Sequence, residues 1–482
     1  MGSEWPTVTL DDISRVGDHG FVDGPFGSNL PASCYTETGI PVIRGSNLSL
    51  GNTRFKGDEF VFVSDETAER LARSICEPLD IIFTKKGTIG QTGLVPEDSH
   101  PRYLLSSNQM KLSVNREIAD PLFVYYYVSS ARSQAKIIRD SEATGVPKTN
   151  LTYFKSFPIP LPPLLEQRII ASHLGTLDDK IELNRRMNET LESMARALFK
   201  SWFVDFDPVI DNALAAGNPI PEPLSARAQT RRDLGTKRKP LPKNIQKLFP
   251  NAFVFDEEMG WIPEGWGVSE FGEILESTIG GDWGKEEEDE KHTLPAVIIR
   301  GADIPDVKQG RRGKIPDRWV ERKKFNSREL CDGDIVIEVS GGSPARPTGR
   351  SVYINQNIID RLGGQVVPAS FCRRFRPKTG LLGLYASLHL EAIYAAGKMW
   401  GYQIQSTGIA NFQTKTFLKT ERVLNPGIEL LEECFARIRP LKDRATSDEQ
   451  ETLAKLRDTL LPQLLSGELR IPDAEKLLAG SL

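Results

Sequence analysis

A heptad repeat within residues 158–205 constrains the fold of this chain more than any other stretch. Prolines at 158, 160, 162 and 163 prevent an earlier helix start, because proline fixes φ and lacks an amide donor. The seam positions then recur in steps of four and three, at Ile170, Leu174, Leu177, Ile181, Asn184, Asn188, Leu191, Ala195, Leu198 and Trp202. A narrow seam with two central amides predicts one strand of a coiled coil, with an ordinary amphipathic helix on a globular core as the alternative. At ~1.5 Å per residue the helix would be about 50 Å long and would act as a spacer.

Composition predicts a soluble, cytoplasmic protein of several domains. The chain has 482 residues, of which 39% are hydrophobic and 26% are charged, and no apolar run is long enough to span a membrane. Its five cysteines lie far apart, which indicates neither a disulfide framework nor a metal knuckle. The net charge of −4 gives no general argument for nucleic acid, so any basic surface must be local.

The second half of the chain repeats the first. PAVIIRGADI at 295–304 matches PVIRGSNL at 41–48, which pairs Arg300 with Arg44. Asp334–Ile337 matches Asp80–Phe83, and the segment 405–427 matches 141–163, which pairs Gly408 with Gly145. Because this period is too long for a solenoid, the repeat indicates an internal duplication with approximate two-fold character.

These boundaries predict a mixed α/β (α+β) fold in which two duplicated globular domains are separated by two long antiparallel helices. The expected order is domain 1–157, spacer helix 158–205, linker 206–262, domain 263–425, spacer helix 426–470 and tail 471–482. The second helix would place Leu453, Leu456, Leu460 and Leu464 on the seam. The segment 206–262 is rich in Pro, Ala, Asn and charged residues, which favours a linker with at most one short helix.

No catalytic motif is present, so the chain is expected to be non-catalytic. The glycine-rich stretches at 87–93 and 341–350 lack the lysine–hydroxyl pair that cradles phosphates. Asp334 and Glu338 superficially suggest a nuclease pair, but the interpretation we favour is a buried strand running into a turn. The five histidines are scattered, and no metal or cofactor site is expected.

Polar donors recur at matched positions of the two repeats. Arg and Lys can bond guanine edges, Asn and Gln can bond adenine edges, and any of them can bond phosphate. The candidate DNA-binding residues are Arg44, Asn47, Lys85, Lys86, Lys148, Asn150, Arg300, Arg346, Arg350, Asn411, Gln413 and Lys415. Residues 300–324 also carry nine Lys or Arg against four acids, a local basic footprint. A solvated charged face is the alternative for that segment, and a structural turn is the alternative for Arg44 and Arg300.

These residues resemble the DNA-specificity subunit of type I restriction–modification systems over nearly the whole chain. The resemblance rests on GIPVIRGSNL (39–48), DIIFTKKGTIG (80–90), IPLPPLLEQRIIASHLGTLDDKIELN (159–184), ALFKSWFVDFDP (197–208) and, in the second half, GGSPARPTGR (341–350) and LRDTLLPQLLSGELRIP (456–472). The second copy departs from the pattern, because LNPGIELLEECFARI replaces PPLLEQRIIASHL and leaves Glu166-Gln167 without a mate.

The resemblance implies two target-recognition domains, each reading one half of a split double-stranded DNA sequence, with the helices as a ruler between them. It also implies two methyltransferase subunits and, through the complex, motor-nuclease subunits, with S-adenosylmethionine, ATP and Mg²⁺ on those partners. The surfaces expected to dock methyltransferase are the outward helix faces and the helix exit, at Glu166, Arg168, Asp178, Lys180, Arg185, Glu189 and Asp205–Pro208.

Two other functions fit the same residues. A non-catalytic scaffold or phage-defence decoy would use both domains for protein contacts instead of DNA. A detached half of a fused restriction–methyltransferase enzyme would require a catalytic domain upstream, which the start WPTVTLDDI just after Met1 disfavours.

Overall fold

The computed structural model describes residues 5–470 apart from 18, 52, 142–146, 238–239, 344 and 407–408, together with Pro472. The expected pairing of Gly145 with Gly408 and most of the tail 471–482 lie outside these residues. The chain forms two compact units: unit 1 contains residues 1–181 and 453–482, and unit 2 contains residues 182–452. Each unit therefore holds one repeat together with parts of the long helices.

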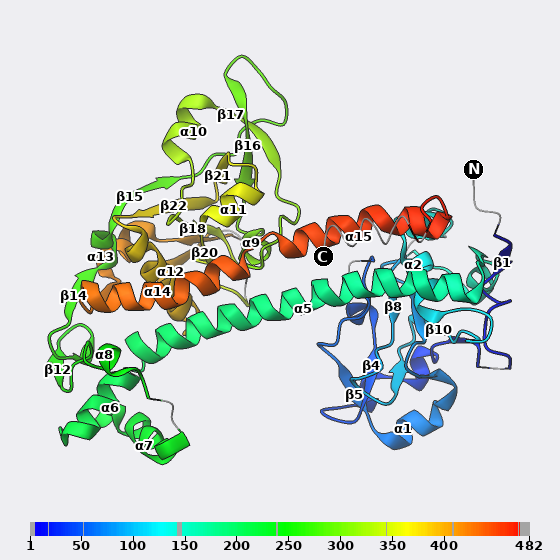
Figure 1. Cartoon of the computed structure of the whole chain (residues 1–482), viewed down its shortest axis with the longest axis horizontal. Coiled ribbons are helices and arrows are strands. Elements are labelled where there is room, and N and C mark those ends of the chain that lie inside the picture. The colour runs from blue at the N-terminus through cyan, green and yellow to red at the C-terminus, as the bar shows by residue number, and fades with distance from the viewer. Residues whose placement is uncertain are drawn as a thin grey trace. The chain divides into compact units, whose positions relative to one another are not determined.

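Unit 1 is built on two sheets (Figure 1). The first is antiparallel, in the order β2 (Phe21–Asp23), β10 (Gln109–Leu112), β7 (Ile81–Thr84) and β8 (Thr92–Leu94). The second is mixed, in the order β3 (Tyr35–Thr36), β5 (Val61–Val63), β4 (Ile40–Ile43), β9 (Tyr103–Leu105) and β6 (Ile75–Cys76). Strands β4, β7 and β10 are buried at every position, as expected for strands covered on both faces.

The remaining elements of unit 1 close its core. β1 (Thr7–Thr9) pairs with β11 (Pro158–Pro160), and the helices are α1 (Asp65–Arg70), α2 (Pro121–Ser129), α3 (Ala131–Arg139) and α4 (Leu151–Lys155). Helix α2 begins where Asp120 accepts the Phe123 amide hydrogen and Pro121 takes the first helical position. Its buried aromatic residues join the core over the first sheet.

Unit 2 repeats this topology. Its antiparallel sheet runs β15 (Leu275–Gly280), β22 (Cys372–Pro377), β18 (Ile335–Glu338) and β20 (Ser351–Tyr353). Its mixed sheet runs β17 (Asp317–Glu321), β16 (His292–Ile299) and β21 (Val366–Pro368), and β14 (Gly267–Glu270) pairs with β25 (Arg422–Asn425). The helices of this repeat are α9 (Ile304–Lys308), α10 (Arg322–Arg328), α11 (Gln356–Arg361), α12 (Gly380–Ala395) and α13 (Thr414–Thr420).

The two repeats agree in strand order and in strand direction. β16 pairs antiparallel with β17 and parallel with β21, as β4 does with β5 and β9. Unit 2 adds a small sheet of β19 (Ser340–Gly341), β24 (Ile409–Phe412) and β23 (Gln403–Ser406). The fold class is thus mixed α/β with an internal duplication.

Helix α5 (Leu164–Phe203) is continuous and falls within the stretch predicted from its heptads. In unit 1, Ile170, Leu174 and Leu177 are buried in one cluster with Leu453, Leu460 and Leu464, while Ile181 and Leu456 are partly buried. In unit 2, Asn184 and Asn188 are buried, Leu191 and Leu198 are half-buried, and Ala195 joins a cluster with Leu430 and Ile438. The N-terminal part of α5 thus packs with residues 453–464 in unit 1, and its C-terminal part packs with residues 430–438 in unit 2. This is the order expected for antiparallel helices.

The second spacer is not one helix, contrary to the sequence expectation for 426–470. It consists of α14 (Ile428–Ala445) and α15 (Glu449–Ser466), with a break at 446–448. At the break, Arg361 Nη1 donates to the Thr446 carbonyl at 2.7 Å and Asn355 Nδ2 donates to the Thr446 hydroxyl at 2.7 Å. Side chains from another part of unit 2 thus satisfy polar groups that the end of α14 leaves without helical partners.

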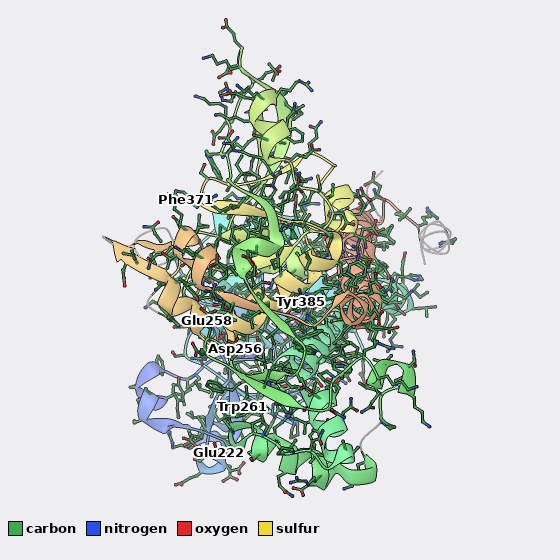
Figure 2. The ribbon with its side chains drawn as sticks, turned by 90° about the vertical axis from the view of Figure 1, so that its left-hand side faces the viewer. Glu222, Asp256, Glu258, Trp261, Phe371 and Tyr385 are labelled. Carbon is green, nitrogen blue, oxygen red and sulfur yellow. The ribbon has the colours of Figure 1, made fainter. Side chains whose placement is uncertain are left out.

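The segment 206–262, expected to be a linker, is folded. It contains α6 (Asp207–Ala216), α7 (Ser225–Leu234), α8 (Lys243–Gln246) and the hairpin β12 (Phe253–Asp256)–β13 (Gly260–Pro263), gathered near the C-terminal end of α5 (Figure 1). Phe206, Phe249 and Ile262 are buried with Trp202 of α5, which anchors the segment. Asp256, Glu258 and Trp261 mark the hairpin in Figure 2.

Three residues expected to dock methyltransferase are internal instead. Asp207 and Pro208 are buried at the start of α6, where Asp207 accepts two hydrogen bonds from Arg227, each 2.7 Å long. Asp178 also points inward, because its side chain is only 13% exposed and bonds Tyr126 and Arg457.

Candidate functional site

In each unit, the loop after the central strand of the first sheet meets the loop before the short helix that precedes the spacer. In unit 1, Lys86 forms a bridge with Lys148, and the Thr149 amide donates to the Lys85 carbonyl at 2.9 Å. In unit 2, Ser340 pairs with Asn411, and the Phe412 amide donates to the Val339 carbonyl at 2.8 Å. The structure thus brings together loops that are 62 and 71 residues apart in sequence, at the same place in both repeats.

The lysines of unit 1 differ in how they are held. Lys86 and Lys148 are both exposed on the paired loops. Lys85 is less exposed, and its Nζ lies 3.2 Å from Asp23 Oδ1. Asn150 is exposed, but its side-chain oxygen caps α4 by accepting the Tyr153 amide hydrogen.

Arg44 and Asn47 build a turn after β4. Asn47 is completely buried and donates to the Lys56 and Asp58 carbonyls, at 3.1 and 2.9 Å, while its oxygen accepts the Arg44 amide hydrogen. Arg44 Nη2 donates to the Glu59 carbonyl at 2.8 Å. The structure therefore gives Asn47 a structural role and removes its side chain from the surface.

Arg300 forms the matching turn after β16. Its Nε and Nη2 donate to the two carboxylate oxygens of Asp303, both at 2.8 Å, and Nη2 also donates to the Lys314 carbonyl. These hydrogen bonds raise the pKa of Arg300, so it stays charged. Most of the hydrogen-bond donors of Arg300 are thus engaged inside the turn. These contacts agree with the alternative given above, in which Arg300 is a structural turn residue.

The remaining candidates of unit 2 divide by exposure. Arg346, Asn411 and Lys415 are exposed, Gln413 is half-buried, and Asn411 Oδ1 accepts the Ser340 hydroxyl hydrogen at 2.6 Å. Arg350 is bound bidentately to buried Glu338, at 2.9 and 2.6 Å. Asp334 is likewise bound by Arg376, so both nuclease-like carboxylates are held in ion pairs at the ends of the buried strand β18, a pairing that the sequence did not indicate.

The basic footprint at 300–324 is largely neutralised. Arg312 pairs with Asp317, Arg318 with Glu286, and Lys308 with Glu391. Two of these three acids come from outside the footprint, so counting charges along the segment overestimates its positive surface.

A polar pocket of about 540 Å³ opens in unit 1 beside the paired loops. Its walls come from the turn after β4, the β7–β8 loop and the β9–β10 loop. Arg44 and Lys86 line it together with neutral donors and acceptors, including Thr84, Gln91 and Gln109. Sequence reasoning missed these three neutral residues, because Thr84 ends β7, Gln91 lies in the loop before β8 and Gln109 begins β10, and they share no local motif.

The described part of the chain holds no group of three or more His, Cys, Asp or Glu placed to bind a metal ion. Across those same residues, no helix is both long and apolar enough to cross a membrane.

The comparisons with known proteins agree with this architecture. The family profile described as "Type I restriction modification DNA specificity domain" matches residues 2–193. The HindI specificity subunit of Haemophilus influenzae is 25% identical across 97% of this chain and 100% of its own length. The MjaIX specificity subunit of Methanocaldococcus jannaschii is 23% identical across 96% of this chain and 94% of its own length.

A solved structure shares the fold. The S subunit of a type I restriction–modification system from M. genitalium superimposes with a TM-score of 0.53 at 14% identity, and the match covers 96% of each chain. The profile match to residues 2–193 and the two relatives aligned along nearly their whole length make the chain similar to the specificity subunits of type I restriction–modification systems.

Proposed function

We propose that this chain supplies the DNA sequence specificity of a type I restriction–modification complex, with each repeat reading one half of a bipartite target. The observation that carries the proposal is the loop pair that recurs in both repeats, Lys86 with Lys148 and Ser340 with Asn411. Exposed lysine and asparagine on paired loops supply phosphate and base-edge donors. A duplicated reading surface matches a target with two halves.

The chain would act without catalysis of its own. S-adenosylmethionine, ATP and Mg²⁺ would belong to two methyltransferase subunits and to motor-nuclease subunits, and the flipped base would enter the methyltransferase. Outward helix residues such as Glu166, Arg168 and Glu189 would dock the methyltransferases, once for each repeat. Because Asp178 and Asp207 point inward, they are left out of this docking surface.

The direct test is a selection from duplex DNA with randomised sequence, using the full chain purified from its host with the subunits that remain bound. A split motif with a constant gap is the expected result. Enrichment of no motif, with only protein partners recovered, would favour the scaffold or decoy alternative instead.

The long helices would set the gap between the two half-sites. Four residues inserted after Asn188 add ~6 Å and about one helical turn, so the seam stays roughly in phase. At ~3.4 Å per base pair, the preferred gap should then grow by one to two base pairs while both half-sites stay the same. The second spacer needs a matched insertion, because both helices contribute to each core cluster.

Two inserted residues serve as the control, because they rotate the seam by ~200° and should disrupt packing instead of lengthening the gap. A folded four-residue variant that keeps the original gap would refute the ruler.

A further inference from the structure

The pocket of unit 1 and one ion pair of unit 2 occupy the same place in the two repeats. The Thr84 amide donates to the Gln91 carbonyl at 3.1 Å, and the Glu338 amide donates to the Arg350 carbonyl at 2.8 Å. Across the sheet, Gln109 stands opposite Thr84 as Cys372 stands opposite Glu338. The backbone thus equates Thr84, Gln91 and Gln109 with Glu338, Arg350 and Cys372 respectively.

In unit 1 these positions form the floor of the open pocket. Thr84 and Gln109 are each only 2% exposed, and Gln91 is half-buried with its side-chain oxygen 3.5 Å from the Thr84 hydroxyl. Among the described residues that line the pocket, none is acidic, and Arg44 and Lys86 are the cations. The pocket therefore has neutral hydrogen-bonding groups at its floor and the positive charges of Arg44 and Lys86 in its walls.

In unit 2 the corresponding space is filled by charge. The buried Glu338 carboxylate receives the Arg350 guanidinium at 2.6 and 2.9 Å. A Cβ placed on Gly301, the mate of Gly45, would lie 2.5 Å from Glu338 Oε1. At Gly45 the nearest atom to such a Cβ is Gln91 Oε1, at 3.4 Å.

The rims of the two sites differ as well. The Lys85 amide donates to the Asn108 carbonyl at 2.7 Å, and the Val339 amide donates to the Phe371 carbonyl at 2.9 Å, so Asn108 and Phe371 correspond. Asn108 is an exposed amide, whereas Phe371 is an apolar side chain that is 63% exposed (Figure 2).

Neutral amides at the floor of a pocket suit a base edge better than a phosphate. Glutamine donates and accepts together, which matches the N6 and N7 edge of adenine, whereas a phosphate presents acceptors only. The cations Arg44 and Lys86 lie where they could hold the adjacent phosphates while the floor reads the base.

Building on the proposed function, we propose that this pocket is the base-selecting site of unit 1, with Gln91 reading an adenine edge and Gln109, whose side-chain oxygen accepts the Ser106 hydroxyl hydrogen, lining the floor beside it. The Glu338–Arg350 ion pair fills the same position in unit 2, so the two repeats differ in whether this scaffold position is open to a base.

The test replaces Gln91 by Met, which keeps its length and removes its hydrogen bonds. The full chain, purified from its host with its bound subunits, selects from a duplex pool in which both halves are randomised. Preference at one adenine position of one half-site should fall about tenfold or more. The other half-site of the same molecule is the internal control, since its unchanged motif shows that the protein is folded and assembled.

A reciprocal exchange sharpens the test. The T84E/Q91R variant should lose or change that single position, and E338T/R350Q should alter only the other half-site. Met399→Leu, a buried substitution of similar size in unit 2, controls for general repacking.

The outcomes separate the two proposals. If wild-type protein selects no bipartite motif, the proposed function fails. If wild-type protein selects one and Gln91→Met leaves every position unchanged, the pocket does not read a base. An equal loss on all sequences with a flatter salt dependence would also overturn the inference, because it would assign the pocket to phosphate.

Discussion

The two repeats share one backbone plan but differ in what they bury. The Leu10 amide donates to the Phe157 carbonyl in unit 1, and the Phe271 amide donates to the Glu421 carbonyl in unit 2, so Phe157 and Glu421 correspond. Phe157 is a buried ring, whereas Glu421 is a buried carboxylate held by His389, Lys398 and Tyr402 at 2.9, 2.8 and 2.6 Å. The strand order is thus the same in both repeats, although a buried apolar residue in unit 1 is replaced by a buried ionic cluster in unit 2.

The spacer helices show a second difference. Lys442 Nζ of α14 lies 2.6 Å from Glu192 of α5 and 3.4 Å from Glu391 of α12, all in unit 2. The first helical hydrogen bonds, from Gln167 to Pro163 in α5 and from Leu431 to Gly427 in α14, align the two helices. In this alignment Lys442 of α14 corresponds to Asp178 of α5, which lies 2.9 Å from Arg457. Each repeat therefore has a charged residue with an oppositely charged partner at this helix position, and the charge is negative in unit 1 and positive in unit 2. Unit 2 buries more of this charge and should be the more sensitive to its loss.

Glu391→Ala should produce the largest effect. Glu391 partners Lys442 and Lys308, so its removal leaves a buried lysine without one carboxylate and should cost unit 2 roughly 3–5 kcal/mol of unfolding free energy. Urea denaturation, monitored through hydrogen exchange of the α12 amides, measures this loss of unfolding free energy. Asp317→Ala, which breaks a pair with a 69% exposed carboxylate, is the control and should cost less than about 1 kcal/mol. Equal effects of the two variants would contradict the comparison.

Acid should weaken unit 2 before unit 1. Burial favours protonation of Glu421, but His389, Lys398 and Tyr402 overcome it and lower its pKa from 4.5 to about 2. Burial likewise opposes ionisation of Glu391, and Lys442 and Lys308 lower its pKa to about 2. Because both folded pKa values are depressed, the stabilisation is present above pH 4.5 and is lost as the pH falls toward 2, by about 3 kcal/mol for Glu421.

Hydrogen-exchange protection factors, which correct for the slower intrinsic exchange in acid, should therefore fall earlier in β25 and α13 than in β11 and α4 as the pH is lowered from 6 to 3. Glu421→Gln should flatten the dependence in unit 2 only. Simultaneous loss of protection in both units would show that the ionic core is not the acid-sensitive element.

Asp178→Ala should have a smaller effect, in unit 1. Asp178 accepts hydrogen bonds from Tyr126 and Arg457 at 2.7 and 2.9 Å but keeps some solvent contact, so the expected loss is about 2 kcal/mol. The neighbouring Asp179→Ala, at a side chain that is 70% exposed, is the matched control. Thermal unfolding of both variants measures the difference, and a loss at position 178 no greater than that at 179 would remove Asp178 from the core contacts.

Asn184→Leu should give the smallest change and the opposite sign. Asn184 is buried, and its Nδ2 has no hydrogen-bond partner within the described residues. Replacing it with an apolar side chain should raise the unfolding free energy by about 1 kcal/mol or less. The seam of unit 2 would then be apolar at this position, like the seam of unit 1. Destabilisation in the same denaturation assay would instead assign the amide a role in helix register.

Local patterns predicted the parts of the fold that local forces determine. The proline run and the heptads located α5 within Leu164–Phe203, and the repeated turns at Arg44 and Arg300 revealed the duplication. The contacts of Arg361 and Asn355 with Thr446 at the break could not be predicted, because both residues lie far from Thr446 in the sequence. The segment 206–262 resembled a linker in composition, and its folded state depends on tertiary packing, because Phe206, Phe249 and Ile262 are buried in one cluster with Trp202 of α5.

The candidate site was predicted less completely. The exposed lysines of the paired loops follow from sequence, but the burial of Asn47 and the pairing of Arg350 with Glu338 depend on tertiary contacts. Gln109 reaches the pocket only because strand register sets it opposite Thr84, which sequence spacing does not reveal.

The strand pairs β1–β11 and β14–β25 have a consequence for how such a protein can evolve. Thr7 pairs with Pro160, and Gly267 pairs with Asn425, so each repeat starts and finishes at neighbouring backbone positions just before a spacer helix. A segment whose ends lie side by side can be exchanged as a cassette while the chain on either side keeps its course. Recombination between these strands would replace one repeat in a single genetic step and leave the spacer helices unchanged.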